Sequence, residues 1–509
     1  MRRARVLIVN CYFPELREPV RLVHEIPNAL APVLLAAEFA PARCGIRLYN
    51  EVSDGFLELY APELLPWPDL VVFTGLTTTL DRMRQLTAYF RTLNPRVVVA
   101  AGGASIRALP TYARQFFDYA CTGDVEEIRE VIAEALGPAW VAEEPRPRYD
   151  LAHWIRRRVG YAESTRGCTF RCGFCSVTAE GRRFRALDLD TLRRQVVAQG
   201  PRDLLILNDN QFYGHDRPFF LERIALLKEL RAAGYFRYWH AFVTDSFLWE
   251  DENLALAREA GCLSLFVGVE TFDEAWLRRV NKTQNSRYAQ ADLVRKCLNA
   301  GIVFQYGLVF DPAERTVAEM HRELGGICDN PDLPAPNFIF TCIPFPGTPV
   351  FHDRLRRGLL LPGTRLRDLE GSTLCVKPLD PVEEVTRFIG TTKNLVGYRW
   401  RHLRRQARFL WRYRHALGPA HRLMSTATCL SVIAPAALSN PRTLLVRKGR
   451  RTHVSTTERL DGVYRPVRRV AARFAAHFEP TPITDGAGAA HPAVADDLLA
   501  ARYLARAAE

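Results

Sequence analysis

Three cysteines, Cys168, Cys172 and Cys175, stand close together in a C-x3-C-x2-C spacing. An aromatic residue, Phe174, directly precedes the third sulfur. Three thiolates this close can bind three irons of a cuboidal iron–sulfur cluster. No fourth cysteine lies nearby, so the fourth iron would be open to a ligand that the protein does not supply. The spacing therefore predicts an iron–sulfur centre with one open corner.

A structural zinc site is the main alternative for these thiols. Such a site needs four ligands that close a tetrahedron, and the next histidine and cysteine are His215 and Cys262. Most other cysteines stand singly in apolar runs, which is typical of small buried hydrophobic residues. With 12 cysteines in 509 residues the chain is no disulfide scaffold. The lack of a fourth nearby ligand favours an iron–sulfur cluster over zinc. Because the cysteines are too sparse for a disulfide scaffold, we expect a reducing, cytoplasmic environment.

Residues 1–136 alternate short apolar strands with helical segments, which predicts a doubly wound, Rossmann-like parallel sheet. Ligands of such sheets bind beyond the carboxyl ends of the strands. The residues expected at those ends are Asn10, Gly75, Gly102, Gly103 and Gly123. No G-x-G-x-x-G follows the first strand, which argues against a dinucleotide.

A proline-rich linker is expected at 137–160, before a second α/β domain at 161–375. This domain shows six strand segments: 161–165, 204–208, 238–244, 264–270, 302–310 and 337–343. Six strand–helix units predict a partial (β/α)6 barrel, with its active site at the C-terminal ends of the strands. The cysteine loop directly follows the first of these strands.

Polar residues end two further strands of the predicted barrel. Asn208, Asp209 and Asn210 follow the second strand, where an ordinary polar strand end is an equally good explanation. Glu270 ends the near-continuous apolar run of the fourth strand. A carboxylate in that position needs a polar partner, which favours a role in a site.

Residues 376–509 are expected to form a mainly helical, basic region with a partly disordered tail. Much of the formal net charge of +13 lies after residue 398. The segment 396–417 mixes tryptophan and leucine with arginine, which suits a helix on an anionic membrane or a cap over the barrel. No recognised nucleic-acid module accompanies the charge, so no nucleic-acid partner is expected. Neither a signal-peptide core nor a membrane-spanning stretch is evident.

The cysteine motif, with Phe174 at its aromatic position, resembles that of the radical S-adenosylmethionine (SAM) enzymes. The resemblance implies a [4Fe–4S] cluster on Cys168, Cys172 and Cys175, with SAM chelated to the open iron. It also implies an external electron donor such as flavodoxin or ferredoxin, and cleavage of SAM to a 5′-deoxyadenosyl radical. The residues that the resemblance places beside SAM are Phe174, Asn208, Asp209, Asn210 and Glu270.

The N-terminal domain resembles the cobalamin-binding domain of one large branch of these enzymes, on segments 69–75, 97–103 and 118–126. The resemblance implies cobalamin near the glycine-rich strand ends named above. The D-x-H-x-x-G motif, whose histidine can ligate cobalt, is absent, and Asn10-Cys-Tyr-Phe-Pro14 stands in its place. A domain that has lost cobalamin therefore stays open as an alternative, and so does Cys11 as a cobalt ligand.

These resemblances predict a cobalamin-dependent radical SAM enzyme that methylates an unactivated carbon. The substrate would be a small molecule or a lipid, with a hopanoid-type C-methylase as one candidate. A radical cyclase or rearrangement enzyme without methyl transfer is the alternative, and a non-catalytic protein that keeps the cluster is a third. The expected localisation is cytoplasmic, with peripheral membrane contact if the basic helix binds lipid.

Overall fold

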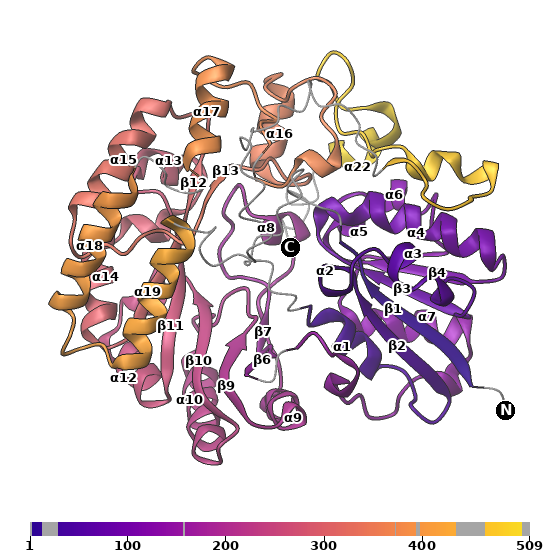
Figure 1. Cartoon of the computed structure of the whole chain (residues 1–509), viewed down its shortest axis with the longest axis horizontal. Helices are drawn as coiled ribbons and strands as arrows, with labels where there is room; N and C mark the ends of the chain where they lie inside the picture. The colour runs from indigo at the N-terminus through magenta and orange to yellow at the C-terminus, as the bar shows by residue number, and fades with distance from the viewer. Residues whose placement is uncertain are drawn as a thin grey trace.

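The computed structural model describes residues 3–12, 29–155, 158–371, 373–392, 398–433 and 464–500. Two α/β lobes lie side by side, and the last described segment returns to the N-terminal lobe (Figure 1). The candidate site residues that the sequence predicts lie at or near the carboxyl ends of the strands in both parallel sheets.

The N-terminal lobe is built on a parallel sheet with strand order β2-β1-β3-β4-β5. Residues 6–9 of its interior strand β1 are fully buried, because helices cover both faces. The strands are β1 (Ala4–Asn10), β2 (Cys44–Asn50), β3 (Leu70–Thr74), β4 (Val98–Gly102) and β5 (Tyr119–Cys121). The helices are α1 (Ala31–Ala37), α2 (Glu51–Asp54), α3 (Leu57–Tyr60), α4 (Leu80–Leu93), α5 (Ala104–Ala108), α6 (Pro110–Ala113) and α7 (Ile128–Ala135). The predicted doubly wound domain is confirmed.

The second lobe is a curled parallel sheet with strand order β13-β12-β11-β10-β9-β6. Its strands are β6 (Val159–Ala162), β9 (Arg202–Leu207), β10 (Phe236–Val243), β11 (Cys262–Glu270), β12 (Val303–Phe310) and β13 (Ile339–Thr341). A short antiparallel pair, β7 (Thr165–Arg166) and β8 (Arg185–Ala186), brackets the cysteine loop. The sheet does not close on itself, since β6 and β13 are its two edges. The predicted partial barrel is confirmed.

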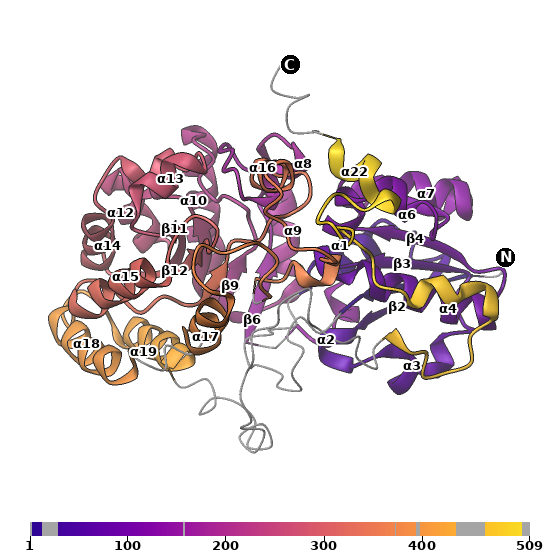
Figure 2. The same cartoon turned by 90° about the horizontal axis from the view of Figure 1, so that it is seen from above.

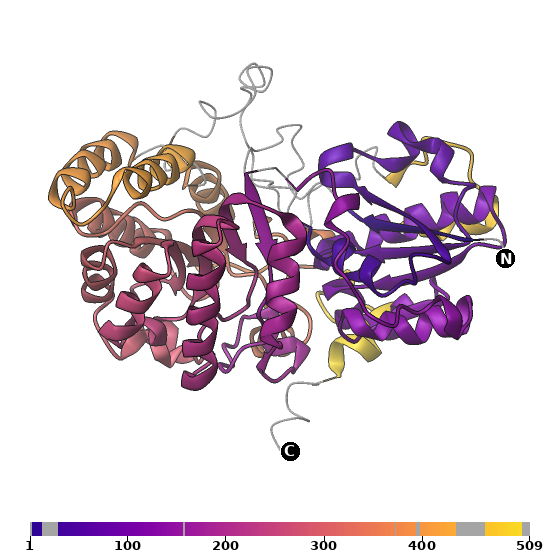
Figure 3. The same cartoon turned by 90° about the horizontal axis from the view of Figure 1, so that it is seen from below.

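Helices cover the outer face of this sheet, and the view from below shows those of residues 189–232 outside the strands (Figure 3). The helices of this lobe up to residue 356 are α8 (Ser176–Glu180), α9 (Leu189–Gln199), α10 (Arg217–Ala232), α11 (Asp245–Leu248), α12 (Asp251–Glu259), α13 (Glu274–Arg279), α14 (Gln290–Asn299), α15 (Val317–Asp329) and α16 (Pro349–Arg356). Along β11 the alternate residues Leu265, Val267 and Val269 are buried beneath these helices. Phe266 and Glu270 belong to the opposite, inner face and are partly exposed.

The segment between the lobes is packed against both of them. Tyr149, Trp154 and Ile155 share one apolar cluster with Leu30 and Val33 of the N-terminal lobe. The Tyr149 hydroxyl also donates to the carbonyl of residue 161 at 2.7 Å. This cluster fixes the N-terminal lobe beside the β6 edge of the barrel.

The C-terminal region divides between the two lobes. Helices α17 (Val382–Thr392), α18 (Arg399–Arg412) and α19 (Pro419–Ile433) lie against the barrel lobe, as the view from above shows (Figure 2). Residues 464–500, including α22 (Ala495–Leu499), pack on the N-terminal lobe. Tyr464 donates to Asp81 at 2.7 Å, and Asp497 accepts from the backbone N–H of Tyr112 at 2.9 Å. None of the described helices combines the length and apolar content that crossing a bilayer requires.

Candidate active site

The loop that carries Cys168, Cys172 and Cys175 runs from β7 to α8. Gly173 in its centre donates its N–H to the Val280 carbonyl at 2.7 Å and accepts from the Val350 N–H at 3.0 Å. The loop is thereby pinned between the segment after α13 and the start of α16. All three cysteines are free thiols on this short, fixed loop.

Polar groups of the barrel lie against two of the sulfurs. The Phe170 N–H donates to Cys168 Sγ at 3.4 Å, and the Gln284 amide donates to Cys172 Sγ at 3.5 Å. Burial, with the neighbouring Cys172, raises the pKa of the Cys175 thiol to about 11. Burial also raises the pKa of Cys168. Such thiols keep their protons until a metal displaces them.

The donor set fits a cluster better than a single ion. Among the described residues, no three His, Cys, Asp or Glu side chains converge closely enough to hold one metal ion. A cuboidal cluster does not need that convergence, because each thiolate binds a different iron. Three free thiols on one loop match three protein-bound corners.

Phe174 and Glu270 lie close together because Lys282 contacts both of them. Phe174 packs against Trp276 with ring centroids 5.6 Å apart, and Lys282 Nζ lies 5.6 Å from the Phe174 centroid. The same ammonium group lies 2.6 Å from Glu270 Oε1 in a nearly buried ion pair. Glu270 adopts a positive φ of 64°, a strained conformation that concentrates at functional sites. The strand end is therefore held in one geometry by an ion pair beside the cysteine loop.

Asp209 faces the interior of the protein. Its carboxylate accepts from the N–H and hydroxyl of Ser164, both at 2.6 Å, and from the Thr165 N–H at 2.8 Å. The fully buried Arg223 lies 3.6 Å from it. The protein itself thus uses both carboxylate oxygens, and they hold the chain that leads into the cysteine loop.

The two asparagines on either side of Asp209 have different surroundings. Asn210 accepts from the Gly167 N–H at 3.1 Å, directly before the first cysteine. Asn208 is partly exposed at the end of β9, and its backbone N–H donates to the Ala162 carbonyl at 2.7 Å. Asn208 is therefore partly exposed and Asn210 is exposed at the strand ends, whereas Asp209 between them is buried.

Sequence reasoning missed four polar side chains of this site: Gln211, Asp245, Gln284 and Gln290. Gln211 is fully buried and accepts from the Thr169 N–H at 2.9 Å, inside the cysteine loop. Asp245 is also fully buried, and Gln290 donates to it. Burial raises the pKa of Asp245 to about 7. The sequence signal of Asp245 and Gln290 was weak, because polar residues at helix starts are usually caps.

The carboxyl edge of the N-terminal sheet faces the barrel lobe. Gly103, with φ of 106°, packs directly on the backbone of Gly75, where a side chain would collide. Asn10 donates to Asn50 at 2.9 Å, and the Gly123 N–H donates to the Glu127 carboxylate. Gly102 ends β4 at this same edge. Residues 13–28, which include Pro14 and His24, lie outside the described residues.

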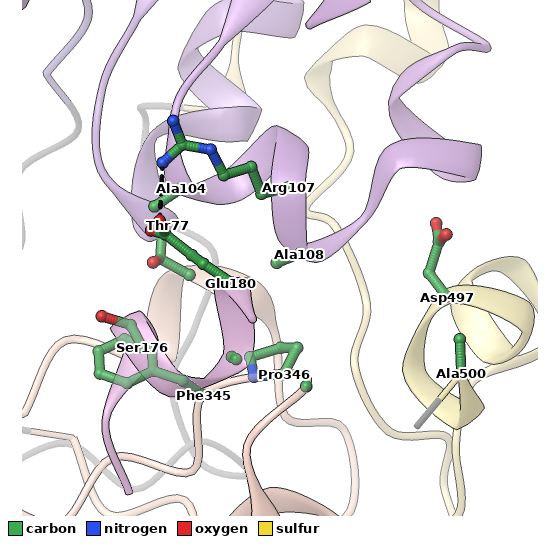
Figure 4. Close-up of a pocket in the computed structure, with 12 residues that line it drawn as sticks. Thr77, Ala104, Arg107, Ala108, Ser176, Glu180, Phe345, Pro346, Asp497 and Ala500 are labelled. Atoms are coloured by element: carbon green, nitrogen blue, oxygen red, sulfur yellow. Dashed lines mark ion pairs between the residues drawn. The ribbon is translucent and has the colours of Figure 1, made fainter. Parts of the chain in front are cut away.

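A pocket lies between this edge and the cysteine loop (Figure 4). Thr77 and Ala104 line it from the N-terminal lobe, and Ser176, the residue after Cys175, lines it from the barrel. Arg107 and Glu180 form an ion pair of 3.2 Å between the two sides. Helix α8, which follows the cysteine loop, and the segments that follow β3 and β4 therefore border one small pocket.

Acidic residues of the N-terminal lobe meet arginines of the barrel beside this pocket. Asp124 pairs with Arg182 and lies 3.8 Å from Arg166. Glu126 lies 2.8 Å from Arg166. The acidic segment after β5 thus joins the two lobes next to the cysteine loop.

The model of the radical SAM superfamily matches residues 162–320, the stretch that contains the three cysteines, Glu270 and Lys282. The chain is 24% identical over 328 residues to bacteriochlorophyllide d C-8(2)-methyltransferase of Chlorobaculum tepidum, covering 57% of this chain and 69% of that protein. It is 24% identical over 302 residues to hopanoid C-2 methylase of Rhodopseudomonas palustris, covering 54% of this chain and 55% of that protein.

A solved structure is similar to this chain in fold. The radical SAM methyltransferase TsrM of Kitasatospora setae, solved with cobalamin and a [4Fe–4S] cluster, superposes with a TM-score of 0.51 at 18% identity. The match covers 70% of this chain and 78% of TsrM, and at this identity it concerns the fold. The family match identifies a radical SAM domain at residues 162–320, and the fold of the chain is similar to that of TsrM.

The family motif and the observed geometry agree on where the site lies, namely at the C-terminal ends of the barrel strands. The loop with the three thiols follows the first barrel strand, and Glu270 ends the fourth. Both lie at the C-terminal edge of the curled sheet, where barrels of this kind carry their chemistry.

Proposed function

We propose that this radical SAM enzyme is a cobalamin-dependent methyltransferase that acts on an unactivated carbon. The observation that carries the proposal is the small pocket between the lobes, whose lining residues Ser176, Thr77 and Ala104 follow the cysteine loop, β3 and β4 in the chain. The names of the two relatives, both methyltransferases acting at carbon positions, support methyl transfer. When bound, the cluster and SAM supply a 5′-deoxyadenosyl radical and methylated cobalamin supplies the methyl group.

We assign the residues of the chain to four roles: binding the cluster, binding SAM, positioning the loop and binding cobalamin. Cys168, Cys172 and Cys175 would hold the cluster, while Phe174, Asn208, Asn210 and Glu270 would bind SAM. Asp209 would act as a positioning residue, because it holds residues 164 and 165 in front of the loop. The strand ends that would border cobalamin are Asn10, Gly75, Gly102, Gly103 and Gly123.

The test is anaerobic purification with cobalamin supplied, followed by metal analysis and turnover with SAM, substrate and a reductant. Iron and cobalt together, with S-adenosylhomocysteine and 5′-deoxyadenosine as coproducts, are the expected result. Deoxyadenosine alone would favour the cyclase or rearrangement alternative. Iron without cobalt would contradict the proposed mechanism, and failure to cleave SAM would favour a non-catalytic role.

Reduction of the cluster also requires a partner. We propose an external one-electron donor of the flavodoxin or ferredoxin type, which fits the requirement of radical SAM enzymes for a reductant. Reconstituted enzyme should form deoxyadenosine with reduced flavodoxin and not with oxidised flavodoxin.

We further propose a lipid substrate, of hopanoid type, and peripheral contact with an anionic membrane. Helix α18 supports this, because Trp400 and Trp411 are 82% and 69% exposed on it while Phe409 is buried against the protein. Arg404 and Arg408 are exposed between the two tryptophans, and the helix contains no acidic residue. Tryptophan and arginine on one helix face are typical of helices that lie in a membrane interface.

Flotation of the full chain with vesicles tests the membrane contact. Binding to phosphatidylcholine vesicles that contain phosphatidylglycerol should exceed binding to phosphatidylcholine alone and should weaken with salt. Replacing both Trp400 and Trp411 by serine should abolish flotation, whereas Tyr60→Ser, at a residue 71% exposed on the other lobe, should not. Equal flotation of all three proteins would contradict the contact.

A further inference from the structure

Four phenylalanine rings form a continuous row on the inner face of the curled sheet. Phe242 of β10 contacts Phe266 of β11 with ring centroids 5.5 Å apart. Phe266 stacks on Phe338 at 5.6 Å, and Phe338 stacks on Phe340 of β13 at 4.6 Å. The row therefore crosses the sheet from β10 to β13.

The row passes over β12 because that strand has a glycine at the crossing point. A Cβ added at Gly307 would overlap the Phe338 ring, so only glycine lets the ring lie flat on the strand. The two terminal rings nevertheless stay in contact with solvent, with Phe242 37% and Phe340 42% exposed. Exposed contiguous aromatic surface of this kind marks a binding surface more often than a core.

The row lies next to the candidate active site along the same strand. Phe266, Gly268 and Glu270 alternate along β11 and share the inner face. A Cβ at Gly268 would lie 2.8 Å from both Glu270 Oε1 and Lys282 Nζ. The Glu270–Lys282 pair thus covers Gly268, and the aromatic row begins at the next residue on that face.

The polar side chains beside the row on β10 and β12 are uncharged. His240 packs beside Phe242 with centroids 5.3 Å apart and shares a hydrogen bond of 2.8 Å with Ser264. Burial lowers the pKa of His240 to about 4, so its ring is neutral near pH 7. Gln305, next to the row on β12, is bonded to Thr428 of α19 at 2.9 Å.

We propose that this aromatic row binds the apolar ring system of the substrate and presents one of its carbons toward the Glu270 end of β11. Four strands at their usual spacing span about 14 Å, which suits a fused-ring hydrocarbon rather than a single small ring. The proposed occupant is a small molecule, because the row is confined to the inner face of a curled sheet. That the bound molecule is the substrate rests on the proposed function. That the row binds an apolar ring compound does not depend on it.

The test uses the full chain and an uncharged fluorescent aromatic amine, N-phenyl-1-naphthylamine, without SAM or reductant. The wild-type chain should bind the dye in a saturable manner. Phe340→Ala and Phe242→Ala should each weaken binding at least fivefold, and Gly307→Val should do the same by displacing Phe338. Tyr288→Ala, at a residue 45% exposed elsewhere on the barrel lobe, is the matched control and should leave the affinity unchanged.

Two outcomes would overturn the inference: no saturable binding to the wild-type chain, or equal affinities for the wild type and for both single phenylalanine variants. Far-ultraviolet circular dichroism checks that each variant is folded. If Gly307→Val does not fold, Phe340→Ala still tests the inference, because Phe340 is 42% exposed and its loss should disturb the fold less. Dye binding that follows the predicted pattern, together with turnover that yields no S-adenosylhomocysteine, would refute the proposed methyl transfer and leave the binding surface standing.

Discussion

Lys282 Nζ lies 2.6 Å from Glu270 Oε1, and this ion pair ties the end of β11 to the segment that fixes the cysteine loop. Two residues before Lys282, the Val280 carbonyl accepts from Gly173 in the centre of that loop. Two residues after it, Gln284 donates to Cys172 Sγ. One short segment thus positions both the strand end and the sulfurs.

Lys282→Met should destabilise the fold by about 3–5 kcal/mol, because it leaves the nearly buried Glu270 carboxylate without its partner. Urea unfolding measures the loss. The exposed pair of Arg278 and Glu274 gives the control, and Arg278→Met should cost less than about 0.5 kcal/mol. Equal effects of the two substitutions would contradict a stabilising role for the buried pair.

Asp209→Ala should lower both stability and iron content. The substitution removes three hydrogen bonds to residues 164 and 165 and leaves Arg223 buried without its carboxylate, a loss of about 3–5 kcal/mol. Asp203→Ala, at a side chain 41% exposed on the same strand, should change stability by about 0.5 kcal/mol or less. Full iron content in a folded Asp209→Ala protein would show that the loop does not depend on this carboxylate.

Because of Asp245, the free energy of unfolding should fall as the pH rises from about 4 to about 7. Its pKa is about 7 in the folded chain against an ordinary value of 3.8, so between these values the folded state binds more protons than the unfolded state. Asp245→Asn removes this dependence, and its advantage over the wild type should grow to about 4 kcal/mol by pH 8.

Urea unfolding of both proteins at pH 4 to 8 measures that difference. Asp251→Asn, at a side chain 89% exposed, should follow the wild type at every pH. Curves for Asp245→Asn that run parallel to the wild type would mean that Asp245 is ionised throughout.

Alanine at Cys168, Cys172 or Cys175 should abolish the bound cluster, because each thiolate would hold a different iron. Iron analysis and the visible absorption of the reconstituted protein measure the loss. Cys121→Ala, at a partly exposed cysteine of the N-terminal lobe, should keep full iron content. Retention of the cluster after any one of the three loop substitutions would contradict the predicted ligand set.

Local patterns were enough to predict both sheets. The apolar run 6–9 and the Gly102-Gly103 pair that ends β4 indicate buried parallel strands and tight turns without any knowledge of their neighbours. Strand ends were less certain: β13 is only Ile339–Thr341 within the predicted 337–343. Edge strands have fewer partners, so their length depends on what packs beside them.

The role of Asp209 could not be read from its position in the chain. A polar strand end suggested a ligand contact, whereas the structure turns the carboxylate toward Ser164 and Arg223. The orientation of a side chain after a strand depends on the path of the preceding loop, which sequence spacing does not encode.

By itself the sequence determined the three-thiol motif, the order of two parallel α/β domains and the polar residue at the end of the fourth barrel strand. These follow from residue spacing and from the period of buried residues, which are local properties of a chain. Only the tertiary structure decided that Lys282 neutralises Glu270, that residues 464–500 pack on the N-terminal lobe, and that Phe242 and Phe340 belong to one aromatic row. Those relationships depend on the path that the chain takes between the elements, so the folded arrangement and not the spacing of the sequence brings these residues together.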